Sequence, residues 1–492
     1  QGVIFDYSLS LFPDNEIING QLIFSPLNEI ILKLCREDSL YKRIFNESFK
    51  LTKNLYKATT DIHVTIYEFL EKVLSFLTQF EECEIEEDEI SFFIENTLEI
   101  FIKEHLFHLK CYYSQTYEKE RYEPNLIEKT FLDDFEQAFD AFSYSIEILK
   151  ENLLNYNSDS KKNEIKILMN EVKSRFDDIY LFIKYYRKEI DTNLYDLSPK
   201  MKEMNNLNLP VFGTYRYNEE IIFIKEINQE ITIFDSMKYS KKITVIGSDG
   251  HYYSFIMKIT EFLVLDQRIM IFNHFLNRYL FTKLKTYSIT PLTLKFGVIQ
   301  YVNGMTTLNQ MIIDYRKKVG SLKYDDEKCL LSIESNFFNQ ELNNNKQQED
   351  EEYCYHLYDK LSLIQHLEIF RYLNQITKER KNDLRESIWS ISTTSEKWFE
   401  STINYTLTCS VSSIVGHLIG LGDRNLNSIM INKENGYLMH IDFCDSFEYS
   451  EKVPFRMTRN LVSAFGPCGT EGTFSEKCEE TLSLIRTKKE II

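Results

Sequence analysis

Two acidic residues near the C-terminal end of the chain, Asp423 and Asp442, have the type and spacing that phosphoryl transfer uses. Asp423 follows a glycine-rich break, and Asp442 comes nineteen residues later, after a short apolar run. In phosphoryl transfer one carboxylate positions the attacking hydroxyl, and the other holds Mg²⁺ on the phosphates. Spacing alone leaves a second interpretation open, in which both are loop-end carboxylates that cap turns.

A lysine and further acids lie upstream. Lys258 ends the second of two β-prone runs that flank Asp249-Gly250, a pattern typical of a β-hairpin. An ammonium group at that place could reach phosphate oxygens, although a lysine at a strand end is usually solvated. Glu261 and Asp266 follow at the start of a predicted helix and offer carboxylate partners for Lys258.

The elements that position these residues follow from glycine content and hydrophobic spacing. Of the 15 glycines, only two precede Gly213, so the first part of the chain reads as packed α-helices. Helical periodicity is clear around residues 66–77, 130–155 and 164–189, and the aromatic stripes of these runs indicate helix-packing core. Further expected elements are strands at 221–224, 231–234, 287–294, 298–302, 429–432 and 437–441, helices at 356–378 and 403–420, and a polar surface loop at 339–352.

Composition excludes several classes of protein. The 492 residues are 43% hydrophobic, enough for two to four folded domains, and the net charge of −18 disfavours a direct nucleic-acid binder. The nine cysteines show no metal-ligand spacing and indicate a reduced, intracellular chain. No apolar run approaches the roughly 18 residues that span a bilayer. Because the first residue is Gln1, we expect a fragment of a longer protein.

The order of these parts, a glycine-turn hairpin, a lysine, an acidic helix, Asp-Arg and Asp-Phe, resembles that of protein kinases. The chain resembles the phosphatidylinositol-3-kinase-related kinases over about residues 195–487, more weakly over 98–195, and over 1–97 only in the helical character of their FAT region. The strings that carry the resemblance are Leu209-Pro-Val-Phe-Gly-Thr-Tyr215, Gly247-Ser-Asp-Gly250, Ile313-Asp-Tyr-Arg-Lys-Lys318, Ser395-Glu-Lys-Trp-Phe399, His440-Ile-Asp-Phe443 and Val453-Pro-Phe-Arg-Met-Thr-Arg459. Within the family the chain looks most like the target-of-rapamycin branch, which the strings at 313–318 and 395–399 resemble, whereas Gly469-Thr-Glu-Gly-Thr-Phe474 is more similar to the DNA-damage checkpoint branch.

The resemblance implies an α+β fold, a two-lobed protein-kinase-like domain of the phosphatidylinositol-3/4-kinase type preceded by an all-α region. The implied domains are a FAT-type part (1–97), an FRB-like bundle (98–197), a kinase N-lobe (198–302) and a C-lobe (303–492). The chain stops before the C-terminal FATC element of the family.

By resemblance, Asp423 is the catalytic carboxylate, with Asn425 and Lys258 as further catalytic residues, and Asp442 and Ser428 hold the metal. The implied nucleotide-binding residues are Lys258, Glu261, Asp266, Ile256, Tyr287, Tyr301, Val302, Met430 and Ile441. Within this set, Asp266 is the helix partner of Lys258, Tyr301 stacks on adenine, and the Val302 backbone hydrogen-bonds the base.

Three residues depart from the family pattern. Asn425 stands where a histidine is expected, and Ser428 stands where an asparagine metal ligand is expected. Loss of the histidine donor could lower the rate by about 10²–10³-fold, by analogy with oxyanion donors. Cys444 also replaces the glycine of the usual Asp-Phe-Gly.

Active Ser/Thr protein kinase is therefore the first expectation, with ATP and Mg²⁺ as cofactors and Mn²⁺ as an alternative metal. A catalytically weakened pseudokinase or scaffold and a checkpoint-type kinase are the alternatives. Lipid kinase activity is disfavoured, because residues 443–453 carry three acids against Lys452 alone.

The resemblance also implies protein substrates and target-of-rapamycin complex subunits, such as a WD-repeat protein on the C-lobe. Rapamycin–immunophilin binding is expected to be weak or absent, because Glu118 and Phe176 replace aromatic positions and Ser114 alone matches. The expected location is the cytoplasm, with endomembranes or the nucleus as alternatives.

Overall fold

The protein divides into two compact units in the computed structural model. The N-terminal unit comprises residues 1–263 and 288–301, and the C-terminal unit comprises residues 264–287 and 302–492. The structure describes residues 16–18, 21–23, 39–59, 61–82, 87–113, 126–154, 162–184, 186, 193–216, 218–234, 240–260, 262–293, 295–320, 364, 367, 371, 382–422, 424–447 and 454–490.

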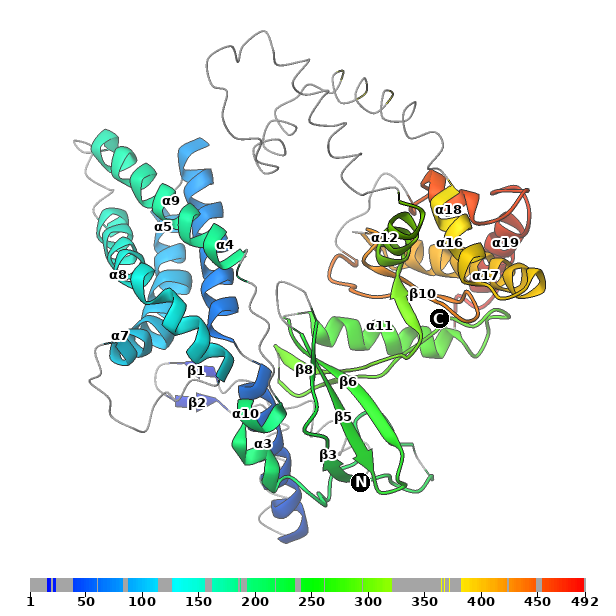
Figure 1. The fold of residues 1–492 in the computed structure, drawn as a ribbon, viewed down its shortest axis with the longest axis horizontal. Coiled ribbons are helices and arrows are strands. Elements are labelled where there is room, and N and C mark those ends of the chain that lie inside the picture. The colour runs from blue at the N-terminus through cyan, green and yellow to red at the C-terminus, as the bar shows by residue number, and fades with distance from the viewer. Residues whose placement is uncertain are drawn as a thin grey trace. The chain divides into compact units, whose positions relative to one another are not determined.

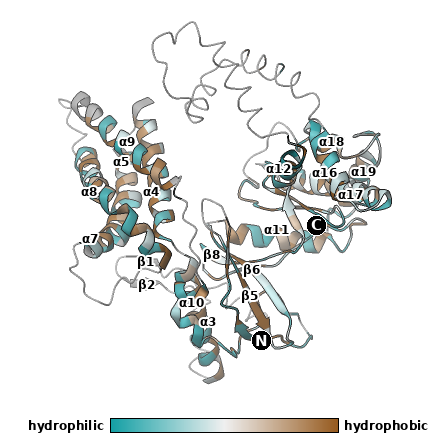
Figure 2. Ribbon diagram, in the orientation of Figure 1, coloured by the Kyte–Doolittle hydropathy of each residue, from teal (hydrophilic) through white to brown (hydrophobic). Residues whose placement is uncertain are grey.

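Long helices of the N-terminal unit form a bundle (Figure 1). Its members are α4 (Ile62–Glu82), α5 (Glu87–Phe93), α6 (Glu99–Phe101), α7 (Phe107–Tyr113), α8 (Leu126–Leu154) and α9 (Lys162–Lys184), with the π-helical turns η1 (Ile94–Leu98) and η2 (Ile102–Leu106) on either side of α6. Hydrophobic and hydrophilic residues mix along each helix, as an amphipathic helix requires (Figure 2). The helices predicted over 130–155 and 164–189 are confirmed as α8 and α9.

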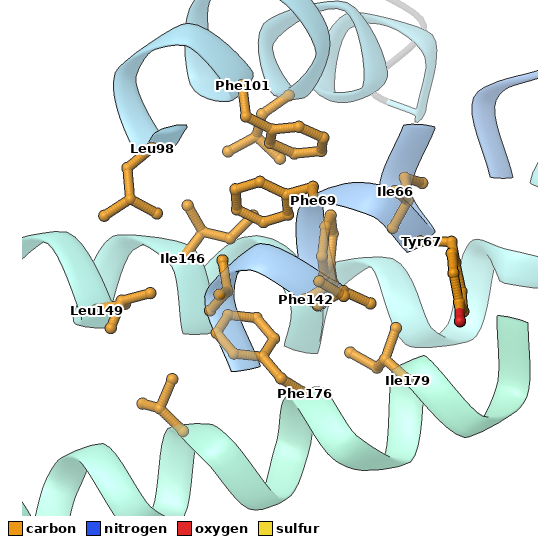
Figure 3. Packing of buried hydrophobic residues seen from close by; sticks show 14 of the residues in the cluster. Ile66, Tyr67, Phe69, Leu98, Phe101, Phe142, Ile146, Leu149, Phe176 and Ile179 are labelled. Carbon is orange, nitrogen blue, oxygen red and sulfur yellow. The ribbon is translucent and has the colours of Figure 1, made fainter. Parts of the chain in front are cut away.

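The predicted aromatic stripes lie in the core of this bundle (Figure 3). Phe142 and Phe176 are fully buried, and their ring centroids lie 6.3 Å apart at 72°. Phe69 meets Phe142 at 6.3 Å and 89°, the edge-to-face geometry that aromatic pairs favour. The predicted domain boundary after residue 97 stays a prediction. It falls within η1, whose Leu98 is buried in the same core.

Two helices that flank the bundle pack elsewhere. α3 (Ser39–Thr59) precedes the bundle and α10 (Leu194–Leu197) follows it. Leu55 of α3 and Leu194 of α10 share a hydrophobic cluster with Ile243 of a β-sheet. The bundle is therefore inserted between two helices that belong to the core of the sheet.

A buried ion pair joins the end of α3 to this sheet. The Lys241 ammonium lies 2.5 Å from the Asp61 carboxylate, and neither side chain is exposed. Lys241 Nζ also donates to the Thr59 carbonyl oxygen at 3.1 Å. A charge without access to water is costly unless it is paired, so the pair constrains how the end of α3 meets the sheet.

The sheet of the N-terminal unit is antiparallel, with the order β3-β5-β6-β8-β7 and with β4 paired to β5. Its strands are β3 (Ile224–Ile227), β4 (Thr232–Ile233), β5 (Lys241–Gly247), β6 (Tyr252–Ile259), β7 (Ile289–Pro291) and β8 (Phe296–Gln300). A separate strand pair comprises β1 (Glu16–Ile18) and β2 (Gln21–Ile23). The hairpin predicted around Asp249-Gly250 is confirmed as β5 and β6. The strands predicted at 221–224 and 231–234 are β3 and β4, which begin slightly later than predicted.

The two faces of the β5–β6 hairpin differ in burial. One face is buried and consists of Lys241, Ile243, Val245, Phe255 and Met257. The opposite face is half-buried and carries Lys242, Thr244, Ser254, Ile256 and Lys258. Strand alternation therefore separates the candidate nucleotide residues from the core.

The segment around Gly297 differs from its prediction. The sequence predicts strands on either side of Gly297, but this glycine lies inside β8, paired with Lys258 of β6 and with Pro291 of β7. A Cβ atom at this position would lie 2.5 Å from the Thr290 carbonyl oxygen. Glycine here permits a close approach of strands and does not mark a turn.

The C-terminal unit combines helices with the three-stranded sheet β11-β10-β9. Its elements are α11 (Leu263–Leu276, from Val264 on), β9 (Met305–Thr307), α12 (Leu308–Val319), α16 (Asp383–Ile391), α17 (Ser395–Leu418), β10 (Ile429–Asn432), β11 (Leu438–His440), α18 (Arg459–Ser463) and α19 (Thr473–Thr487). The predicted strand 429–432 is confirmed as β10, and the next predicted strand is β11. The predicted helix 403–420 is the later part of α17. The predicted loop 339–352 and most of the predicted helix 356–378 lie outside the described residues.

Candidate active site

Three of the predicted nucleotide-binding residues belong to the sheet of the N-terminal unit. Ile256 pairs with Ile299, and Lys258 pairs with Gly297, so both point to the half-buried face of β6. Tyr301 follows β8, and its backbone N–H donates to the Ser254 carbonyl oxygen at 2.9 Å. The sheet therefore fixes the backbones of Ile256, Lys258 and Tyr301 relative to one another. Glu261 lies outside the described residues.

The other predicted site residues that the structure describes belong to the C-terminal unit, and several of them lie in or beside the β10–β11 hairpin. Met430 lies in β10, and Ile441 follows β11 and donates its N–H to the Ser428 carbonyl oxygen at 3.0 Å. The turn between the strands needs Gly436, which has a φ of +76° and whose Cβ position would lie 2.2 Å from the Ser401 carbonyl oxygen. The hairpin thus delivers Asp442 directly after its second strand.

The loop before β10 is organised by the Asn425 side chain. Asn425 Oδ1 accepts hydrogen bonds from the Asn427 N–H at 2.8 Å and from the Ser428 N–H at 2.9 Å. The Ser428 hydroxyl donates to the same oxygen at 3.2 Å, and Ser428 is buried. The Asn425 carbonyl therefore folds the loop, and only its amide nitrogen could donate to a phosphate.

Arg424 connects this loop to the end of the hairpin. Its Nη1 donates to the Ile441 carbonyl oxygen at 3.2 Å, its Nη2 to the Asp442 carbonyl oxygen at 2.6 Å, and its Nε to the Gly422 carbonyl oxygen at 2.8 Å. Asp442 adopts a φ of +55°, a backbone conformation that is uncommon for residues other than glycine and that the surroundings must stabilise. Arg424 provides such surroundings.

The predicted catalytic Asp423 lies outside the described residues, but both of its neighbours are placed. Gly422 donates its N–H to the Asp445 carbonyl oxygen at 2.7 Å, and Arg424 binds the carbonyl of Asp442. The chain on both sides of position 423 is therefore tied to the segment 442–445. The residues on either side of position 423 contact the segment that bears Asp442, although the two are far apart in sequence.

Asp266 and Tyr287 join this cluster from other elements of the C-terminal unit. Asp266 Oδ1 accepts a hydrogen bond from the Phe443 N–H at 3.0 Å and is nearly buried. Burial raises the pKa of Tyr287 well above its usual value, and the charges of Asp266 and Asp442 raise it further while Arg424 opposes them. The predicted pairing of Asp266 with Lys258 stays a prediction, as does the role of Val302.

His440, the residue two before Asp442, is neutral near pH 7. Burial, and secondarily the charge of Arg424, lowers its pKa to about 3. This histidine adds no positive charge beside Asp442. Arg424 does carry positive charge into this cluster, and the sequence interpretation gave it no role although it adjoins Asp423.

The donor set fits a magnesium ion that is held mainly by phosphates. Asp442 offers a carboxylate and Ser428 a hydroxyl, and Mg²⁺ prefers such hard oxygen ligands and usually binds few protein side chains beside a nucleotide. Among the described residues there is no cluster of three or more His, Cys, Asp or Glu side chains that could hold a metal ion by itself.

In the same parts of the chain, no helix has the length and apolarity that a bilayer crossing requires.

The family model described as "Phosphatidylinositol 3- and 4-kinase" matches residues 252–492. The serine/threonine-protein kinase TOR of Oryza sativa subsp. japonica is 33% identical over 316 residues, which cover 61% of this chain and 12% of the relative. The kinase of the same name from Arabidopsis thaliana is 31% identical over 378 residues, or 73% of this chain and 14% of the relative. This chain therefore spans about an eighth of the length of these relatives.

A solved structure supports the same fold. The structure titled "FAT and kinase domain of CtTel1" aligns with a TM-score of 0.50 and 18% sequence identity, covering 94% of this chain and 34% of that chain. At this identity the alignment concerns the fold alone. The predicted α+β class, with a kinase-type domain after a helical region, is confirmed.

Proposed function

Because the chain belongs to the phosphatidylinositol-3-kinase-related kinase family and resembles its target-of-rapamycin members, we propose that it is a Ser/Thr protein kinase. It transfers the γ-phosphate of ATP to hydroxyl groups of proteins. The observation that carries this proposal is that Gly422 and Arg424, on either side of position 423, hydrogen-bond to the segment that bears Asp442. Phosphoryl transfer depends mainly on positioning and charge, so a backbone framework that holds these two segments together suits it.

Each residue of the site has a role in this reaction. Asp423 accepts a hydrogen bond from the substrate hydroxyl and orients it toward the γ-phosphorus. Asp442, whose backbone Arg424 holds, binds Mg²⁺ together with Ser428. The metal ion supplies positive charge that neutralises the phosphate oxygens.

Lys258 binds phosphate oxygens, and Tyr301 and Ile256 contact the base on the side of the sheet. By family resemblance, these residues and Asp442 act on the same nucleotide. Met430 and Ile441 offer apolar contacts to the base from the hairpin, and the Val302 backbone hydrogen-bonds it.

The experiment is a phosphate-transfer assay with radiolabelled ATP and a generic protein substrate. Wild-type protein should transfer phosphate, and Asp442→Ala should abolish transfer. Asp314→Ala, which removes an exposed carboxylate of α12 in the same unit, is the matched control and should leave transfer unchanged. Equal transfer by wild type and Asp442→Ala would refute the proposal.

The same assay separates lipid from protein kinase activity. We expect no phosphorylation of phosphatidylinositol vesicles, because the acidic segment 443–453 repels an anionic headgroup. Labelled phosphatidylinositol would overturn this expectation.

By resemblance we also propose that a WD-repeat complex subunit binds the C-lobe and that the protein acts in the cytoplasm.

A pseudokinase is the second candidate, and the loop 424–428 favours it. The oxygen of Asn425 is engaged by Asn427 and Ser428, so the loop offers fewer groups to a transferring phosphate than a histidine and an asparagine would. A pseudokinase would bind ATP in a magnesium-dependent way without transferring phosphate to protein. Calorimetric ATP binding, measured beside the transfer assay, distinguishes the two.

A further inference from the structure

The Tyr301 ring, which is proposed to stack on adenine, is already contacted by two groups of the N-terminal unit. The Lys242 ammonium lies 4.3 Å from the centroid of the ring, a cation–π contact. The Phe234 ring stacks on Tyr301 at 6.2 Å with an interplanar angle of 29°. A base that stacks on Tyr301 must therefore share the ring with these groups or displace one of them.

Lys242 is the group that can move. The backbone of Phe234 is held by a hydrogen bond from its N–H to the Ser240 carbonyl oxygen at 2.9 Å, and its side chain rotates about only two bonds. The Lys242 side chain is long and rotates about four bonds. Among the described residues, no carboxylate forms an ion pair with the Lys242 ammonium, which lies over the Tyr301 ring instead.

The strand register determines where the released ammonium can go. Lys242 of β5 lies opposite Ile256 of β6, and β5 and β6 run side by side in Figure 1. Lys258 is two residues further along β6, which makes it the diagonal neighbour of Lys242 on the same half-buried face. Diagonal neighbours in an antiparallel sheet lie roughly 7–8 Å apart, within reach of long side chains. Phosphates bound at Lys258 are therefore within reach of Lys242.

We propose that Lys242 selects phosphorylated nucleotides over nucleosides by exchanging the Tyr301 ring for the phosphates when ATP binds. The inference rests on the proposed nucleotide site. An adenine compound without phosphates must break the contact between Lys242 and Tyr301 and offers the ammonium no replacement contact. ATP breaks the same contact and replaces it with a charge-assisted contact to phosphate.

The two ligands respond in opposite directions when Lys242 is replaced by methionine, which keeps the side-chain length and removes the charge. Adenosine should bind about two- to fivefold more tightly to Lys242→Met, because no cation–π contact has to be broken. ATP should bind about two- to fivefold more weakly, because one phosphate contact is lost. The ratio of the ATP and adenosine affinities should therefore fall by about tenfold.

Calorimetric titrations with ATP and with adenosine test the proposal on the whole chain. Lys242→Arg, which keeps a cation, should retain most of the wild-type ratio. Lys225→Met removes an exposed lysine of β3 in the same sheet and should leave both affinities unchanged. In a Tyr301→Leu background, Lys242→Met should no longer tighten adenosine, since the ring that holds the ammonium is gone.

An unchanged ratio in a folded Lys242→Met protein would overturn the proposal. Equal weakening of both ligands would also overturn it, because it would give Lys242 a structural role only. Failure of wild-type protein to bind ATP would instead overturn the proposed function and this inference with it. Thermal unfolding of each variant, compared with wild type, shows that the ratio is measured on folded protein.

Discussion

Replacing Arg424 with methionine should lower the rate of phosphate transfer much more than the affinity for ATP. Arg424 donates hydrogen bonds to the backbone carbonyls of Gly422, Ile441 and Asp442. It therefore connects the loop before β10 with the segment that follows β11. These hydrogen bonds go to backbone atoms, whereas the base is proposed to meet the side chains of Ile256, Tyr301 and Ile441. The variant should therefore disturb the position of Asp442 and spare base binding.

The magnitude follows from these hydrogen bonds. A hydrogen bond to a charged group contributes about 1.5–3 kcal/mol when it is buried, and Arg424 is half-buried, so water can replace part of each bond. We expect the free energy of unfolding to fall by about 2–4 kcal/mol. A shift of the Asp442 carboxylate by about 1 Å should lower kcat by about 10²-fold, the usual cost of misplacing a reacting group.

The assay combines steady-state phosphate transfer with urea denaturation. Arg424→Lys retains the charge, but one ammonium cannot match the fork of a guanidinium, so kcat should stay at least about tenfold below wild type. Arg385→Met, on the exposed side of α16, is the matched control and should change neither quantity. A kcat for folded Arg424→Met within about twofold of wild type would refute the reasoning.

Three further predictions concern stability and binding. Lys241→Met leaves the Asp61 carboxylate buried without its cation and should lower the free energy of unfolding by about 3–5 kcal/mol. Adding Asp61→Leu should restore most of the lost stability. Equal urea denaturation midpoints for the single and double variants would contradict this prediction. His440 has its pKa lowered to about 3, below the roughly 6.5 of the unfolded chain, so the unfolded state takes up a proton first. The stability that neutral His440 contributes is complete above pH 6.5, and the free energy of unfolding should fall by about 1.4 kcal/mol when the pH is lowered to 5.5. In urea denaturation, His440→Asn should remove this part of the dependence of the unfolding free energy on pH. An unchanged dependence in the variant would contradict the prediction. Rapamycin–immunophilin should bind weakly or not at all, because Glu118 stands where an aromatic residue is expected and Phe176, which replaces another, is buried in the bundle core; submicromolar affinity in calorimetry would overturn this.

Elements set by local chemistry could be predicted from the sequence. The spacing of Phe131, Phe135 and Phe142 marks the buried face of α8, because helical periodicity alone decides which side chains share a face. The Asp249-Gly250 turn marks the β5–β6 hairpin for the same local reason. The strand 429–432 that leads to the hairpin of Asp442 was also predictable, since short apolar runs flank a glycine turn.

Features set by contacts between distant residues could not be predicted in this way. Lys241 and Asp61 are 180 residues apart, so no local pattern indicates their ion pair. α3 lies in the same glycine-poor region as the helices of the bundle, but it packs against the sheet, and only its contacts reveal this. Arg424 bonds to residues 17 and 18 positions away, so the sequence shows an Asp-Arg pair without its function.

A double-mutant cycle on phosphate transfer tests the central claim most directly, that Lys258 and Asp442 act on one magnesium-bound ATP. The rates to compare are those of wild type, Lys258→Met, Asp442→Asn and the double variant. Residues that act as a unit are strongly non-additive, so each single variant should lose at least about 10²-fold and the double variant should be no slower than the worse single variant. A double-variant loss equal to the product of the two single losses, or a single variant with nearly wild-type rate, would contradict the claim.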